Sequence, residues 1–216
     1  MLTLATVMML GAAPPSIVDA YKLLVKEKKV DPVLREEGGH WKYVAAVDDL
    51  TPDKGEPVVD TRNGYARFGF QQGPCSTSVE LALYVAGARR FVLVSTDADC
   101  MEGHNASVAA WELQGEKLTD VTEALELKKI AWTDFLDQKA PREEAETVAP
   151  AVALSYTLPR SGTTVQVKLV VMHEPPTGVD QSFGPRAEAL AKKFQRFKVI
   201  ELAWSEKDAK FKKRVP

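Results

Sequence analysis

The chain is short of the residue types on which many functional sites depend. It has only two cysteines and three histidines among 216 residues, so a metal centre built from several such side chains has few candidates. No apolar run reaches the roughly eighteen residues of a membrane-spanning helix, and we predict no membrane span. The formal net charge is −2, which gives the whole molecule no strong attraction for nucleic acid or for an anionic membrane.

Signature motifs of several enzyme classes are also missing. The sequence has no G-x-G-x-x-G after a strand pattern, no G-K-[ST] phosphate loop, no H-E-x-x-H and no G-x-S-x-G, which are the marks of nucleotide-binding proteins, zinc proteases and serine hydrolases. The three histidines, His40, His104 and His173, lie in separate segments. A Ser-His-Asp site would have to be assembled by the fold, so the sequence neither proposes nor excludes one. We predict no cofactor.

Charge is unevenly distributed along the chain. Residues 186–214 contain ten Lys/Arg against four Asp/Glu, a local net charge of +6. A basic segment of this kind can attract an anionic surface, and its interleaved phenylalanines could stack on single-stranded nucleic acid. A solvated basic face is the simpler interpretation, because the same phenylalanines fit the buried side of a helix. We expect no nucleic-acid partner.

The N-terminal segment is apolar and uncharged from residue 2 to residue 13. Its length and the small residues Gly11, Ala12 and Ala13 resemble a signal peptide with its cleavage site, although no Lys or Arg precedes it. We therefore predict that residues 1–13 are a signal peptide and that the protein is exported, to the periplasm or outside the cell. The alternative is a cytoplasmic protein with a buried N-terminal helix.

The two cysteines, Cys75 and Cys100, flank a strongly patterned segment. Residues 79–85 and 91–96 are rich in Val, Leu, Phe and Tyr, and Gly87 allows the chain to reverse between them, a pattern typical of a β-hairpin. If opposed residues have numbers that sum to 175, Leu81 faces Val94 and the apolar side chains share one face. The same register places the two cysteines opposite each other. We predict a disulfide, which the chain-entropy estimate values at about 3 kcal/mol in an oxidising compartment.

Two other roles for these cysteines fit the sequence less well. A catalytic dithiol is usually C-x-x-C, whereas 24 residues separate this pair and no helix begins at the first. A zinc site could use both thiolates and His104, but it would need a fourth ligand such as Asp97 or Asp99.

Further hairpins and two helices complete the expected fold. The spacing predicts a helix after the N-cap residue Ser16 and another after Pro185, while residues 137–150 have the composition of a surface loop. We predict one α+β domain over residues 14–216, with a mostly antiparallel, strongly twisted sheet of about seven to nine strands, an N-terminal helix and a helix near the C-terminus. Besides the hairpin above, the expected strands are residues 40–50, 64–70, 108–113, 118–121, 152–158, 164–172, 199–204 and a last one at Phe211.

Two groups of residues are candidates for a binding site. Asp97, Asp99, Glu102 and His104 lie within eight residues and could hold a divalent cation, although the spacing departs from an EF-hand and a polar hairpin end explains the same residues. Trp41, Trp111 and Trp204 could line a groove for a glycan or a peptide, although aromatic residues in strands are more often part of the core.

The functional prediction follows from a stable scaffold without catalytic signatures. We predict an exported, disulfide-stabilised, non-catalytic binding or interaction module of the bacterial envelope, whose partner is a protein, a peptide or a glycan. One alternative is a hydrolase or metal-dependent enzyme that uses the acidic loop from Asp97 to His104. Another is a protein inhibitor of an enzyme, which would present a rigid protruding loop.

Overall fold

The fold is described from a computed structural model. It covers residues 15–44, 50–52, 55–100, 103–172, 175 and 177–215. The predicted signal peptide, residues 1–13, lies outside these residues, as do the candidate metal ligand Glu102 and His173.

The protein is α+β, as predicted, and its sheets are antiparallel and built from hairpins. The strands form three sheets rather than the single sheet expected from the sequence. A seven-stranded sheet has the order β3-β5-β6-β7-β8-β9, with β4 also paired to β5; a four-stranded sheet has the order β10-β11-β12-β13; and β1 pairs with β2. The strands are β1 (Leu34–Glu37), β2 (His40–Tyr43), β3 (Leu50–Pro52), β4 (Val58–Asp60), β5 (Tyr65–Gln72), β6 (Cys75–Ala86), β7 (Arg89–Cys100), β8 (Gly103–Gln114), β9 (Lys117–Asp120), β10 (Val152–Thr157), β11 (Thr164–Val171), β12 (Val199–Ser205) and β13 (Lys210–Arg214).

Three α-helices accompany the sheets in the described part of the chain. They are α1 (Ile17–Lys26), α2 (Arg142–Val148) and α3 (Phe183–Phe194), with short 3-10 turns η1 (Leu127–Lys129), η2 (Trp132–Phe135) and η3 (Ala149–Ala151). The predicted surface loop at residues 137–150 is wrong, because α2 occupies half of it. The helix contains few apolar residues. Two of them, Ala145 and Val148, lie three positions apart and are fully buried in a cluster with residues of α3.

Helix α1 begins as the sequence predicts. The hydroxyl of Ser16 accepts the backbone N–H of Asp19, and the carboxylate of Asp19 accepts the backbone N–H of Ser16, which satisfies two donors that a helix start otherwise leaves free. The face that points into the core consists of Ile17, Ala20, Tyr21 and Leu24. The N-terminal helix is thereby fixed against the large sheet.

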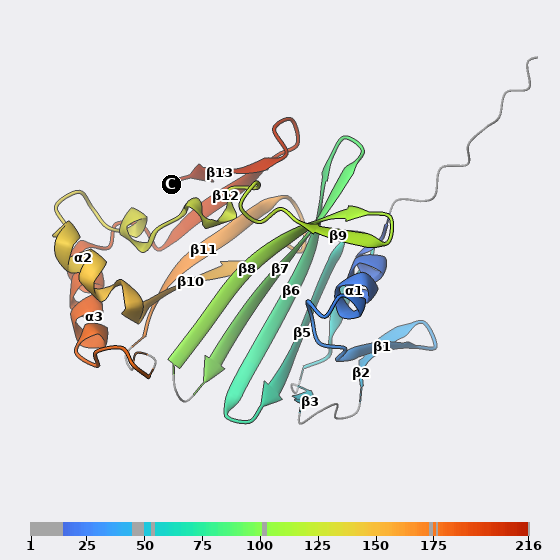
Figure 1. The fold of residues 1–216 in the computed structure, drawn as a ribbon, viewed down its shortest axis with the longest axis horizontal. Helices are drawn as coiled ribbons and strands as arrows, with labels where there is room; N and C mark the ends of the chain where they lie inside the picture. Colours follow the sequence, from blue (N-terminus) through green and yellow to red (C-terminus); the bar gives the residue numbers. More distant parts are fainter. Residues whose placement is uncertain are drawn as a thin grey trace, which may run out of the picture.

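The two faces of the large sheet are covered by different elements (Figure 1). Helix α1 and the β1–β2 hairpin lie over one face, and the four-stranded sheet lies over the other. Strand β7 contributes to both cores, since successive side chains point to opposite faces: Val92 and Val94 face α1, whereas Phe91 and Leu93 face the four-stranded sheet. Helices α2 and α3 pack beside β10 and β11 in a third cluster.

The predicted register of the central hairpin is confirmed. Strands β6 and β7 pair Val79 with Thr96, Leu81 with Val94 and Leu83 with Val92, which are the pairs whose numbers sum to 175. The turn lies at Gly87, with a φ of 59°, a left-handed conformation that glycine adopts at no steric cost. The alternation of apolar residues therefore determined the pairing.

Candidate functional site

The disulfide lies where the strand ends of two neighbouring hairpins meet. Cys75 is the first residue of β6 and Cys100 is the last residue of β7. The two residues form a disulfide, and their Cα atoms are 4.1 Å apart, close to the separation of a non-hydrogen-bonded antiparallel pair. The predicted staple is thus present. In this structure the two sulfurs are bonded to each other and are not available as zinc-binding thiolates.

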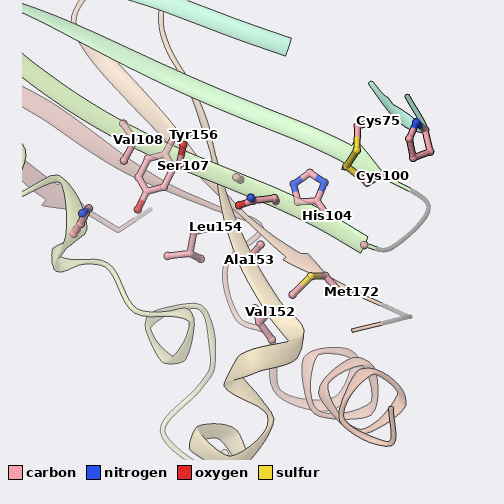
Figure 2. Close-up of a pocket in the computed structure, with 15 residues that line it drawn as sticks. Cys75, Cys100, His104, Ser107, Val108, Val152, Ala153, Leu154, Tyr156 and Met172 are labelled. Atoms are coloured by element: carbon pink, nitrogen blue, oxygen red, sulfur yellow. A yellow bond between two sulfur atoms is a disulfide. The ribbon is translucent and has the colours of Figure 1, made fainter. Parts of the chain in front are cut away.

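A groove of about 830 Å³ opens next to the disulfide, between β8 and β10 (Figure 2). Most of the described side chains that line it are apolar or small, and none of these described residues is an aspartate or a glutamate. Among them Lys128 is the only lysine or arginine, and His104 is the only histidine. The lining residues are Pro74, Cys75, Cys100, Gly103, His104, Asn105, Ala106, Ser107, Val108, Lys128, Val152, Ala153, Leu154, Tyr156 and Met172.

One wall of the groove is the outer edge of β8. Strand β9 pairs with β8 only from Trp111 to Gln114, so within the described chain no strand pairs with the outer edge at residues 103–109. The Ala110 N–H donates to the Thr122 hydroxyl at 2.9 Å, and the Ala110 carbonyl accepts the Val121 N–H, which shows that Ala110 directs its backbone groups away from β7. Since this direction alternates along a strand, Val108, Ala106 and His104 direct theirs the same way.

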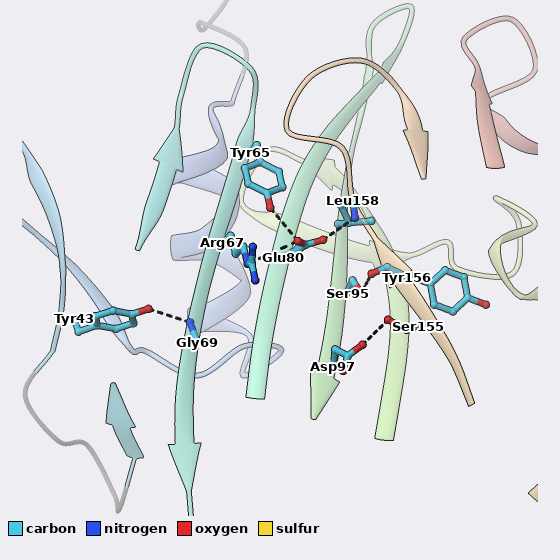
Figure 3. A network of polar contacts seen from close by, with 10 residues as sticks. All are labelled: Tyr43, Tyr65, Arg67, Gly69, Glu80, Ser95, Asp97, Ser155, Tyr156 and Leu158. Atoms are coloured by element: carbon cyan, nitrogen blue, oxygen red, sulfur yellow. Dashed lines mark hydrogen bonds and ion pairs between the residues drawn. The ribbon is translucent and has the colours of Figure 1, made fainter. Parts of the chain in front are cut away.

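The opposite wall is β10, which is an edge strand of its own sheet. Hydrogen bonds of this strand and of the residue that follows it attach it to the face of the large sheet (Figure 3), and the Ser155–Asp97 bond described below is one of them. The Ser95 hydroxyl donates to the Tyr156 carbonyl at 2.6 Å, and the Leu158 N–H donates to the Glu80 carboxylate at 2.7 Å. From Tyr156 toward Val152 the strand borders the groove with its apolar side chains (Figure 2).

The Glu80 carboxylate holds the two sheets together. It also accepts the hydroxyl of Tyr65 at 3.0 Å, and Arg67 lies 3.9 Å away. Burial and the negative charge of Glu80 raise the pKa of Tyr65, since both disfavour the phenolate. On the outer edge of β5 the hydroxyl of Tyr43 accepts the Gly69 N–H at 3.0 Å (Figure 3). These contacts position the strands relative to one another.

Asp97, Ser155 and His104 form a chain of polar contacts beside the groove. The Ser155 hydroxyl donates to one Asp97 oxygen at 2.5 Å, and Nε2 of His104 lies 3.3 Å from the other. The histidine Nε2 is buried without an aligned hydrogen bond. Here the aspartate stands between the serine and the histidine, whereas a hydrolytic triad needs the histidine in the middle to accept the serine proton. The group therefore lacks the arrangement of a serine hydrolase.

The predicted metal ligands are only partly brought together. Asp97 and His104 are neighbours, and Asp99 stands opposite His104 in the β7–β8 register. Glu102 lies outside the described residues. Within the part of the chain that the structure describes, no group of three or more His, Cys, Asp or Glu residues is arranged to hold a metal ion.

The three candidate tryptophans do not share a surface. Trp41 contacts Tyr21 edge-on at 6.1 Å and packs on the α1 side of the large sheet, where Trp111 is buried at 8% exposure. Trp204 packs on the other side of that sheet, with ring centroids 5.0 Å from Phe211 and 5.4 Å from Tyr84. Trp111 is a core residue, whereas Trp41 and Trp204 are half-buried at the margins of two different clusters.

The groove itself was not found by sequence reasoning. Its β10 wall, Val152, Leu154 and Tyr156, was predicted only as a strand, and nothing in the sequence indicated that it approaches β8. One signal was available: residues 103–109 and β10 contain no Lys, Arg, Asp or Glu, which is unusual for strands at an edge.

Comparison of the chain with protein-family models, with curated proteins and with solved structures finds no match. None of the helices in the described residues has the length and apolar character needed to cross a membrane.

Proposed function

We propose that the protein is an exported, non-catalytic binding module, stabilised by its disulfide, and that the groove between β8 and β10 is its site for a polypeptide partner. The observation that carries this proposal is the groove, about 830 Å³ in volume, with an apolar lining and few polar groups. Ligand sites commonly have this size and composition.

Two features support the exported location. A disulfide persists in oxidising compartments and is rare in the cytosol, and here it joins the only two cysteines of the chain. The uncharged apolar segment at residues 2–13 has the composition of a signal-peptide core. Mass spectrometry of protein recovered from the cell envelope tests this location. A mature N-terminus near residue 14 supports it, and an intact Met1 together with two free thiols contradicts it.

The polar groups beside the groove favour binding over catalysis. The Ser155 hydroxyl donates to Asp97, and Asp97 also faces His104, so within the described residues the serine is not paired with a histidine base as in a hydrolytic triad. A hydrolase that uses Asp97 and His104 as acid and base is the alternative. Its test is hydrolysis of a panel of chromogenic esters and glycosides by the wild type and by an Asp97→Asn variant. Turnover that the variant abolishes would favour the enzyme.

Binding is tested by panning a phage-displayed heptapeptide library against the whole oxidised protein. We expect a consensus, and we expect the selected peptides to lose affinity for Ala106→Arg, because Ala106 lines the groove and a long side chain there fills it. Ala153→Arg, on the opposite wall, provides a second groove variant in case the first unfolds.

The matched control is Gln166→Arg. Gln166 is exposed on β11 and is not part of the groove, so the same added charge and bulk should leave binding unchanged. Failure to select any consensus, or equal loss of affinity in Gln166→Arg and Ala106→Arg, contradicts the assignment of the groove as a peptide site.

A further inference from the structure

The proposed peptide site has one wall whose backbone is unpaired, and this specifies how a peptide would bind. Resting on the function proposed above, we infer that the partner is an extended peptide that adds as a strand to the outer edge of β8 at residues 103–109. Alternate side chains of this peptide pack toward Leu154 and Met172. The peptide is apolar at these positions and carries a carboxylate.

The backbone of β8 supplies the first argument. His104, Ala106 and Val108 direct their N–H and C=O groups toward the outer edge, as the bonds of Ala110 to Thr122 and Val121 establish. Among the described residues no strand pairs with these groups. A strand added at the usual spacing of about 4.8 Å would satisfy them, and seven residues of edge give a contact about 23 Å long. An extended polypeptide is the ligand that matches such a row.

The distribution of charge along the sheet edges supplies the second argument. Natural sheets protect exposed edges with charged residues, lysine above all. Strand β13, the far edge of the small sheet, reads KFKKR, and the short strands β1 and β9 read LREE and KLTD. Residues 103–109 read GHNASVA and β10 reads VALSYT. The two edges that border the groove lack the charged residues of β13, β1 and β9, and unlike the three-residue edge strand β3, which reads LTP, they have no proline, which is expected of an edge kept for pairing.

The side chains of the groove define the chemistry of the peptide. Val108, Leu154 and Met172 offer apolar contacts for alternate residues of an added strand. Among the described residues of the lining, Lys128 is the only permanently charged side chain. It forms an ion pair with Glu123, 80% exposed and 3.4 Å away, and its charge also acts on Asp120. An exposed pair of this kind is weak, so a peptide carboxylate can replace Glu123. Charge complementarity therefore favours an acidic peptide over a basic one.

The experiment is an N-methyl scan of the heptapeptides selected by panning. Methylation removes one backbone N–H at a time, and in a strand only every second N–H faces a given neighbour. We expect dissociation constants to rise about tenfold or more at alternate positions and to change less than about twofold between them. Exchanging the acidic residue of the peptide for its amide should weaken binding to the wild type and have no effect on binding to Lys128→Met.

A change on the protein side tests the same contact. Ala106→Pro removes an N–H that points to the groove while leaving the bonds to β7 in place, and proline is tolerated on the free side of an edge strand. We expect it to weaken peptide binding about tenfold, whereas Ala106→Ser, which keeps the N–H, binds as the wild type does. Thermal unfolding of both variants verifies that they are folded.

The outcomes separate this inference from the function on which it rests. If no peptide is selected, the proposed function itself fails. If peptides bind at the groove but the N-methyl scan is flat or lacks a period of two, the strand-addition inference is overturned and the binding site remains. If light scattering finds a dimer that Ala106→Pro dissociates and that peptides do not compete with, the edge pairs with a second copy of the chain, and the peptide occupant is refuted.

Discussion

Replacing both Cys75 and Cys100 by alanine should lower the free energy of unfolding by about 3.5 kcal/mol. The disulfide closes a loop with a sequence separation of 25. On the chain-entropy model a loop of this length removes about 12 cal/mol/K from the unfolded state. For a protein of this size the loss corresponds to a fall in Tm of about 7–14 °C.

The assay is equilibrium unfolding in guanidinium chloride, followed by far-UV circular dichroism, for the oxidised wild type and for the double variant. Because the uncrosslinked chain expands further when unfolded, the slope of free energy against denaturant should also rise. A matched control replaces two exposed serines, one on β6 and one on β8, Ser76→Ala and Ser107→Ala, and should change the free energy of unfolding by less than about 0.5 kcal/mol.

A loss below about 1 kcal/mol with an unchanged slope would refute this reasoning. It would mean that the hairpin of β6 and β7, whose strands pair along their whole length, persists in the unfolded chain and already restrains it without the disulfide.

Two further predictions concern buried and paired side chains. Tyr21→Phe leaves the buried Leu34 N–H, which donates to the tyrosine hydroxyl at 2.9 Å, without a partner, and urea unfolding should record a loss of about 1–3 kcal/mol. Since burial raises the pKa of Tyr21 to about 12, wild-type stability should also fall as the pH rises from about 10 to 12. Hydrogen bonds from Asn63 and Arg160 lower the pKa of Asp60 to about 2, so this carboxylate stabilises the fold above about pH 4 and the effect disappears toward pH 2. Acid titration of Asp60→Asn should show a smaller loss over that interval; an identical acid transition in both proteins would contradict it.

The local pattern of apolar residues was sufficient to predict the central hairpin. The alternation of apolar residues in β6 and β7 allows one register, because a shift by one residue turns every apolar side chain to the opposite face. That register placed Cys75 opposite Cys100, and the disulfide is present. The capping of α1 by Ser16 was predictable for a similar reason, since the partner Asp19 is only three residues away. The alternation of apolar residues did not indicate that both faces of β7 are covered or that the strands divide into three sheets.

The candidate site was predicted less well, because it joins segments that are distant in the chain. Asp97 and His104 lie across one turn of the β7–β8 hairpin, and sequence reasoning grouped them. Ser155, which completes their polar contacts, is 58 residues from Asp97. The sequence contained no indication that these two segments meet.

The sequence by itself determined the features that depend on residues close together in the chain. These are the strands and their alternation, the hairpin register, the disulfide and the N-cap of α1. Each of these follows from interactions across one turn or one strand pair, whose period and spacing are visible in the residue order. Only the tertiary structure decided that β10 lies across the large sheet, tied to it through Ser95 and Glu80. The groove beside the unpaired edge of β8 exists because of that placement, since packing two sheets on a shared core is a property of surfaces and not of sequence period.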